Sequence, residues 1–133
     1  MEQQKKILVA DDEPNITLSL KYLFEDKNYS VIRAENGSEA LEKARAFMPN
    51  LIILDIMMPK SAEFAGHLEK DGGIRVCDKL KQDDTTSHIP IIVLTVKGGI
   101  TDREAAKNVG ADEYITKPFN TNDLLSKVEK LLG

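Results

Sequence analysis

Hydrophobic residues occur along the chain in short continuous runs, separated by longer stretches with helical spacing. Three runs contain no polar residue: Ile7–Ala10, Leu51–Leu54 and Ile91–Leu94. Weaker strand signals occur at Val31–Ile32 and Tyr114–Ile115. Because strands without polar alternation are buried on both faces, the pattern predicts a parallel sheet that is covered by helices.

Helical periodicity fills the intervals between these runs. Pro14 suits the first turn of a helix, and Gly110 suits the end of a helix over Thr101–Val109. An apolar stripe over Leu124–Leu132 predicts a terminal amphipathic helix. Five strand–helix units imply one doubly wound α/β domain over residues 1–133, with right-handed crossovers and helices on both faces of the sheet.

One stretch fits neither pattern. Residues 60–73 (KSAEFAGHLEKDGG) are mostly polar and contain several glycines. We expect an extended loop there, with one helical turn around Phe64 and Leu68, before the next helix begins at Ile74.

Composition narrows the class of protein. The chain has 133 residues with 18 basic and 22 acidic side chains, a net charge of −4, and no basic block that would favour nucleic-acid binding. Cys77 is the single cysteine, which excludes an intrachain disulfide and fits a reducing compartment. The polar start does not resemble a signal peptide, and no apolar run approaches the roughly 20 residues that span a bilayer. We therefore expect a cytoplasmic protein without membrane contacts.

Polar side chains follow four of the expected strands at the point where each one ends. Asp11 and Asp12 follow the first strand, Asp55 the third, Thr95 the fourth and Lys117 the fifth. Ligands of open α/β sheets bind outside the carboxyl ends of the strands. The order of polar residues therefore predicts one site at this rim.

The residue types at this rim indicate phosphoryl chemistry with a metal. Three carboxylates in one place repel one another, and burial raises the cost of their charge. A hard divalent cation removes this conflict, and magnesium suits a site with few protein ligands that is completed by water and phosphate oxygens. Lys117 offers a positive charge to an anion and Thr95 offers a hydrogen bond, which leaves one carboxylate free to attack phosphorus and form an acyl phosphate.

Four segments together carry a resemblance to a known family: ILVADDEP, LIILDIMMP, IPIIVLT and GADEYITKPF. The chain resembles the receiver domains of two-component response regulators from about Lys5 to Leu132. The resemblance implies a flavodoxin-like fold, in which a five-stranded parallel sheet has the strand order 2-1-3-4-5.

The resemblance also assigns the acceptor and the metal ligands. It implies that Asp55 is the phosphoacceptor and becomes a 4-aspartylphosphate. Asp11, Asp12 and Asp55 would bind Mg²⁺ together with the backbone carbonyl of Met57.

Further roles follow from the same resemblance. Thr95 and Lys117 would contact the phosphoryl group, and Tyr114 would be the aromatic switch residue that moves together with Thr95. The Lys117–Pro118 bond stands where the family usually has a cis peptide.

The function implied is a phosphorelay switch and not a conventional turnover enzyme. A histidine kinase or a histidine phosphotransfer protein would donate the phosphoryl group. The surface of the fourth helix, fifth strand and fifth helix would then change and act on a downstream effector protein, without direct contact between this chain and nucleic acid.

Two positions depart from the family pattern. A glycine usually lies eight residues after the phosphoacceptor, but Glu63 stands there, and the family-like continuation resumes only near Asp71–Ile74. Roughly ten residues are therefore inserted beside the site. Val96 follows Thr95 where a small residue is common, and its β-branched side chain would narrow access to the phosphoryl group.

Other interpretations remain open at this point. An Asp-Asp pair after a strand is often only a turn and a helix cap, and a strand tyrosine is often only packing. A receiver-like domain that binds a partner through residues 60–73 without phosphorylation is a second possibility. A conventional enzyme or nucleotide binder is a third, although the chain contains no glycine-rich phosphate-binding motif.

Overall fold

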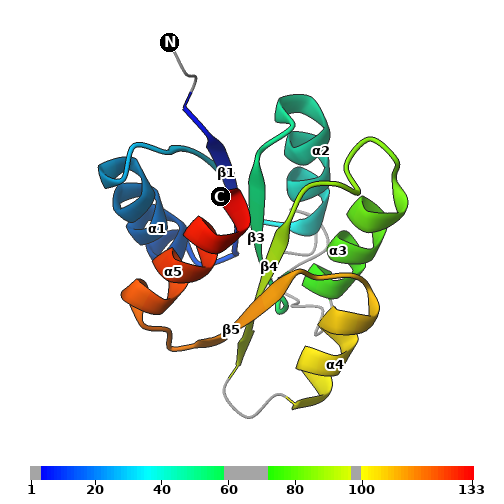
Figure 1. Ribbon diagram of the computed structural model, residues 1–133. Coiled ribbons are helices and arrows are strands. Elements are labelled where there is room, and N and C mark those ends of the chain that lie inside the picture. The colour runs from blue at the N-terminus through cyan, green and yellow to red at the C-terminus, as the bar shows by residue number, and fades with distance from the viewer. Residues whose placement is uncertain (1–3, 59–71, 97–99) are drawn as a thin grey trace.

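The computed structural model describes residues 4–58, 72–96 and 100–133. Five parallel strands form one sheet in the order β2-β1-β3-β4-β5 (Figure 1). The strands and helices alternate along the chain as β1 (Lys6–Ala10), α1 (Pro14–Asp26), β2 (Ser30–Ala34), α2 (Gly37–Phe47), β3 (Leu51–Asp55), α3 (Gly72–Gln82), β4 (Ile91–Val96), α4 (Ile100–Asn108), β5 (Glu113–Lys117) and α5 (Thr121–Leu132). The expected fold class and strand order are confirmed.

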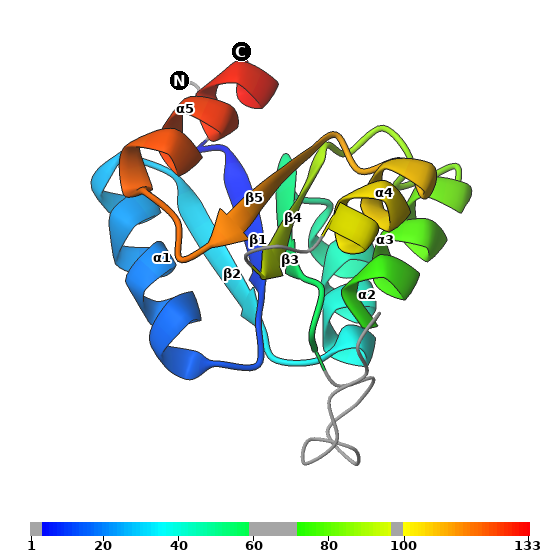
Figure 2. The same ribbon diagram turned by 90° about the horizontal axis from the view of Figure 1, so that it is seen from below.

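Helices cover both faces of the sheet. Figure 1 and Figure 2 show α1 and α5 on one side, and α2, α3 and α4 on the other. Side chains of successive strand residues alternate between the faces, so Ile7 and Ile53 pack in the cluster under α1 and α5, whereas Leu8 and Ile52 pack in the opposite cluster. The three uninterrupted apolar runs are therefore explained by a sheet that is buried on both sides.

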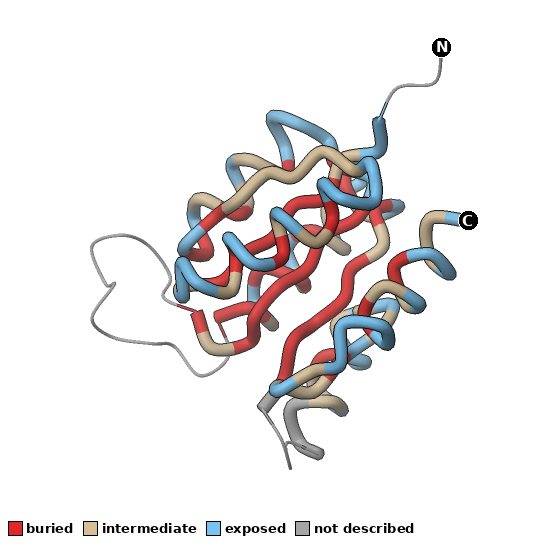
Figure 3. The backbone as a smooth tube through the Cα atoms, turned by 90° about the vertical axis from the view of Figure 1, so that its left-hand side faces the viewer, coloured by how far each residue is buried: buried red, intermediate tan, exposed pale blue. Residues whose placement is uncertain are grey.

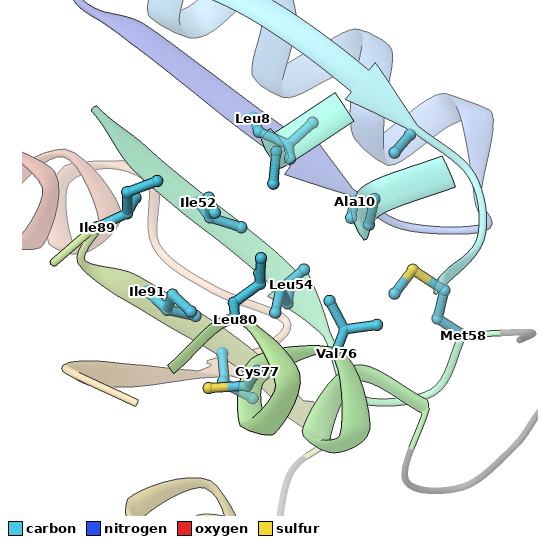
Figure 4. Packing of buried hydrophobic residues seen from close by; sticks show 14 of the residues in the cluster. Leu8, Ala10, Ile52, Leu54, Met58, Val76, Cys77, Leu80, Ile89 and Ile91 are labelled. Carbon is cyan, nitrogen blue, oxygen red and sulfur yellow. The ribbon is translucent and has the colours of Figure 1, made fainter. Parts of the chain in front are cut away.

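The core on the second face is formed by aliphatic side chains of the sheet and of α3. Leu8, Ile52 and Leu54 lie opposite Val76 and Leu80 (Figure 4), and all five residues are buried. Figure 3 shows the central strands buried along most of their length, while the helices are buried on one side only. This packing provides the rigid frame that fixes the carboxyl ends of the strands.

Short sequence signals determine where the helices start and end. Pro14 occupies the first turn of α1. Asn36 caps α2 by accepting a hydrogen bond from the Glu39 amide at 2.8 Å, and the Asn120 side chain caps α5. Gly110 has φ +93° just after α4, a conformation that favours glycine.

The third helix begins earlier than the sequence pattern predicts. It starts at Gly72 and not at Ile74, so Gly72 and Gly73 belong to the helix and not to the loop expected over 60–73. The Gly73 amide donates to the carbonyl of Ile56 at 2.9 Å, and a Cβ at position 73 would lie 2.1 Å from the backbone oxygen of Asp55. Only glycine fits where the start of α3 comes this close to the backbone of Asp55. The hydrophobic periodicity of the sequence gives no sign of this contact.

The expected bounds of the fourth helix are nearly correct, and two other expectations fall on parts of the chain that the structure does not describe. The helix expected over Thr101–Val109 is one residue earlier at each end. The expected turn around Phe64 and Leu68 lies outside the described residues, as does the side chain of Val96. None of the helices within the described ranges is long and apolar enough to cross a membrane.

Candidate functional site

Four strands bring polar residues to one rim of the sheet. Asp11 directly follows β1, Asp55 ends β3, Thr95 lies near the end of β4 and Lys117 ends β5. Asp11, Asp55 and Thr95 are buried, with exposed fractions of 0%, 5% and 1%. Buried carboxylates are rare without a partner, so their surroundings need explanation.

The Lys117 side chain bridges two of the carboxylates. Its Nζ donates to Asp11 Oδ2 at 2.8 Å and to Asp55 Oδ2 at 3.0 Å. Glu13 Oε1 lies further away, at 3.9 Å from the same Nζ. One ammonium therefore joins the residue after β1 and the last residue of β3 to the last residue of β5.

Backbone amides hold the other oxygens of these carboxylates. Asp11 Oδ1 accepts from the Glu13 amide at 2.9 Å, and Asp55 Oδ1 accepts from the Met57 amide at 3.1 Å. Each carboxylate is thus fixed by one backbone donor and by Lys117. Glu13 stands at the N-cap of α1 without a side-chain cap bond, so Asp11 orders the turn before this helix and does not cap it.

Asp12 completes an acidic cluster with the two buried carboxylates. One carboxylate oxygen from each of Asp11, Asp12 and Asp55 lies within 4.8 Å of the others. All three donors are hard oxygen atoms, and a single lysine does not neutralise three carboxylates. The donor set fits a divalent cation such as Mg²⁺ or Ca²⁺.

Burial and the closeness of like charges raise the pKa values of carboxyl groups in this cluster. Burial raises the pKa of Asp55 to about 7, and the neighbouring Asp11 charge adds to this effect against the opposing influence of Lys117. Burial followed by the charge of Asp11 also raises the pKa of Asp12. Burial alone would lower the pKa of Lys117, but the hydrogen bond to Asp11 and the charges of both aspartates outweigh burial and raise it. Lys117 therefore stays protonated.

Thr95 lies near the end of β4 at the same rim, whereas Tyr114 lies further back on β5, in register with Val93. The Thr95 hydroxyl makes a long hydrogen bond of 3.5 Å to the Ile115 carbonyl on β5. Tyr114 keeps 38% of its surface exposed, and the Arg103 guanidinium lies over its ring. The Lys117–Pro118 peptide is cis, as the resemblance implies.

Sequence reasoning missed two residues near the site. Gly73 allows α3 to contact the backbone of Asp55, and the signal for it was the glycine pair that follows the unusual stretch. Arg103 contacts both Tyr114 and Thr116, but no pattern within the polar helix α4 singles it out. Cys77, the single cysteine of the sequence, is fully buried in the core and takes no part in the site.

Comparison with known proteins gives close matches over nearly the whole chain. Residues 7–129 match the response regulator receiver domain family. The alkaline phosphatase synthesis transcriptional regulatory protein PhoP of Bacillus subtilis is 41% identical over 128 residues, which cover 96% of this chain and 48% of that protein. The regulator RpaA of Synechocystis, named a DNA-binding dual master transcriptional regulator, is 35% identical over 127 residues, with coverage of 96% and 48%. The chain thus spans about half the length of these relatives.

Solved structures show the same fold. The chemotaxis response regulator CheY4 of Vibrio cholerae superposes with a TM-score of 0.84 at 28% identity, covering 98% of this chain and 100% of that chain. A putative response regulator from Chloroflexus aurantiacus gives a TM-score of 0.85 at 28% identity, with 98% of both chains covered. The strand order, the family match and these relatives agree, and this chain belongs to the response regulator receiver domain family, the phosphorylation-dependent signalling module of two-component systems.

Proposed function

We propose that Asp55 accepts the phosphoryl group, in a Mg²⁺-dependent reaction, from a phosphohistidine of a sensor kinase or a phosphotransfer protein. The observation that carries this proposal is the Lys117 ammonium that bridges Asp11 and Asp55 beside a three-carboxylate cluster. An Asp55 oxygen would form the new P–O bond while the P–N bond of the donor breaks. The imidazole leaves with the electron pair and takes up a proton, and the product is an acyl phosphate.

Asp11, Asp12 and Asp55, together with the carbonyl of Met57, would hold the metal ion. Mg²⁺, when bound, supplies charge neutralisation for the phosphoryl oxygens. The protein contributes the fixed positions of its carboxylates, each of the two buried ones being held by a backbone amide. Met57 is included because the resemblance to receiver domains assigns this role to its carbonyl, and the bond from its amide to Asp55 Oδ1 keeps the residue next to the site.

Lys117 and Thr95 would respond to the new dianion. Lys117 already lies 3.0 Å from Asp55 Oδ2 and offers a positive charge next to the modified side chain. Among the described residues, the Thr95 hydroxyl makes one long hydrogen bond, which is weak, so the hydroxyl can turn towards the phosphoryl group. Tyr114 would then move into the space beside Thr95, and the surface of α4, β5 and α5 would change.

The partners of the whole protein belong to the same proposal. A histidine kinase or phosphotransfer protein is the donor, and the downstream effector is a protein. Some relatives are named as transcriptional regulators, but this chain matches only about half of their length. We therefore propose no direct contact between the residues of this chain and nucleic acid, and we place its signalling in the cytoplasm.

The proposal is tested by incubating the protein with acetyl phosphate and Mg²⁺ and measuring intact mass. We expect one phosphoryl adduct on the wild type, none on Asp55→Asn, and loss of the adduct in EDTA. Asp84→Asn, which changes an exposed aspartate, is the control and should behave as the wild type. An undiminished adduct on Asp55→Asn would refute the assignment.

The alternative of a phosphorylation-independent binding module depends on the stretch 60–73. Only Gly72 and Gly73 of that stretch are described, and both belong to α3. No described contact favours this alternative.

A further inference from the structure

A cationic side chain from α4 reaches two residues of β5 outside the acidic cluster. Arg103 Nη2 donates to Thr116 Oγ1 at 2.8 Å. The Arg103 guanidinium carbon lies 5.1 Å from the centroid of the Tyr114 ring, within the range of a cation–π interaction. One side chain therefore contacts both a residue next to Lys117 and the proposed switch residue.

The alternation of the strand explains how one arginine reaches both residues. Tyr114 and Thr116 are two positions apart and lie on the same face of β5, whereas Ile115 between them is buried in the cluster under α1 and α5. The hydrogen bond to Thr116 fixes the direction of the guanidinium, and the ring of Tyr114 lies beside it. Arg103 therefore contacts Tyr114 in a defined orientation and not as a freely mobile side chain.

The same contacts connect this arginine to the phosphorylation site. Thr116 precedes Lys117 in the chain and is the register partner of Thr95 on β4. The Thr95 hydroxyl, in turn, bonds to the carbonyl of Ile115 between the two residues that Arg103 contacts. A movement of Thr95 towards Asp55 would change the segment of β5 on which Arg103 rests.

One nitrogen of the Arg103 guanidinium, Nε, is buried without a hydrogen-bond partner among the described residues, although the Tyr114 ring that it faces keeps part of its surface exposed. The cation–π contact attracts the guanidinium to the ring, while an unpaired buried N–H costs free energy. The two effects oppose each other, so the arrangement stabilises the outward Tyr114 by a limited amount that a phosphoryl group can overcome.

We propose that Arg103 is a positioning residue that holds Tyr114 in its outward orientation and so opposes the transition to the phosphorylated state. The inference rests on the proposed function of Asp55, Thr95 and Tyr114. A contact that stabilises only one of two conformations shifts the equilibrium towards it by the free energy of that contact. Removal of the arginine therefore favours the inward Tyr114 and makes Asp55 easier to phosphorylate.

The experiment compares four variants with the wild type. Arg103→Met removes the charge but keeps an apolar stem, Arg103→Lys keeps a charge without the planar guanidinium, and Thr116→Val removes only the hydrogen-bond acceptor. Lys107→Met is the matched control, since it removes a positive charge from an exposed position of the same helix. Two quantities are measured: the rate of adduct formation from acetyl phosphate with Mg²⁺, and the NMR signal of the Tyr114 ring, assigned with Tyr114→Phe.

We expect Arg103→Met to form the adduct about two- to five-fold faster than the wild type, from the typical strength of a cation–π contact with a partly exposed ring. Before phosphorylation, its Tyr114 signal should already be displaced towards the position found in the phosphorylated wild type. Arg103→Lys should be intermediate, Thr116→Val should change in the same direction, and Lys107→Met should match the wild type. If Arg103→Met does not fold, Thr116→Val carries the same test.

Two results would overturn the inference in different ways. An adduct at Asp55 with unchanged rate and unchanged Tyr114 signal in the Arg103 and Thr116 variants would show that the contact has no part in switching, while the proposed function stands. No adduct on the wild type would overturn the proposed function, and this inference with it.

Discussion

At the scale of single residues, the Asp55 carboxyl group is subject to opposing influences. Burial and the charge of Asp11 favour its protonated form, whereas Lys117 and the Met57 amide favour the carboxylate. The result is a pKa of about 7, far above the ordinary 3.8. The side chain is therefore held in a position that costs stability when it is charged, as is common at functional sites.

This conflict predicts a pH-dependent gain in stability for Asp55→Asn. Because the folded-state pKa is raised, the folded protein binds the proton more tightly than the unfolded chain, and stability is lost as pH rises from about 4 to about 7. In EDTA at pH 8, Asp55→Asn should be about 2 to 4 kcal/mol more stable than the wild type, and at pH 4 the difference should be small. Urea unfolding at both pH values measures it, and a difference that does not depend on pH would contradict the account.

Cys77 provides a second residue-scale prediction. The thiol is fully buried, and burial raises its pKa to about 12. The thiolate is the reactive form, so at pH 8 the folded protein contains almost none of it. Ellman's reagent should leave the native protein unmodified and react quickly in guanidinium chloride. Rapid labelling of the native state would show that the core around Cys77 opens more easily than its packing implies.

At the scale of elements, the start of α3 depends on its contact with the end of β3. Gly73 lies against the backbone of Asp55, where an added Cβ would be 2.1 Å from the carbonyl oxygen. The amide of the same glycine donates to Ile56. A helix start and the proposed acceptor strand are thus joined through backbone atoms alone.

Gly73→Ala should therefore destabilise the protein and disturb Asp55. Backbone atoms must move to admit the methyl group, at a cost of about 1 to 3 kcal/mol. Urea unfolding should show this loss, and adduct formation should slow in the same variant. Lys79→Ala on the exposed side of the same helix is the control and should stay within about 0.5 kcal/mol of the wild type. Equal stability of Gly73→Ala and the wild type would show that the two elements are not tightly joined.

The elements also show what a sequence can and cannot reveal. The three apolar runs correctly predicted strands, because burial on both faces leaves a pattern in consecutive residues. Gly110 correctly predicted the end of a helix, because the left-handed backbone conformation there favours glycine. The start of α3 was wrong by two residues, because a close approach between distant backbones leaves no local pattern. The contact of Arg103 with Tyr114 was missed for the same reason.

At the scale of the whole molecule, the strand order determines where the chemistry lies. The gathering of Asp11, Asp55 and Lys117 was predictable, because carboxyl ends of neighbouring parallel strands meet at one rim. Their individual contacts were not, since side-chain geometry depends on packing across the sheet. The exposure of Tyr114 and the hydrogen bond from Thr95 to β5 are further contacts that the sequence could not predict.

Metal binding should stabilise the entire fold. A ligand that binds only the folded state adds about 2.7 kcal/mol at 100 times its Kd. We expect Mg²⁺ to raise the Tm of the wild type, EDTA to reverse the effect, and Asp12→Asn to abolish most of it. Asp84→Asn is the control and should respond as the wild type. An equal response of Asp12→Asn and the wild type in differential scanning calorimetry would place the metal elsewhere.

The most direct test of the central claim locates the phosphoryl group on the chain. After incubation with a phosphorylated histidine kinase or acetyl phosphate and Mg²⁺, borohydride reduces an aspartyl phosphate to homoserine, which peptide mass spectrometry identifies. The account predicts homoserine at position 55, dependent on Mg²⁺ and absent without the phosphoryl donor. Homoserine at Asp11, Asp12 or another acidic residue, with Asp55 unmodified, would contradict it.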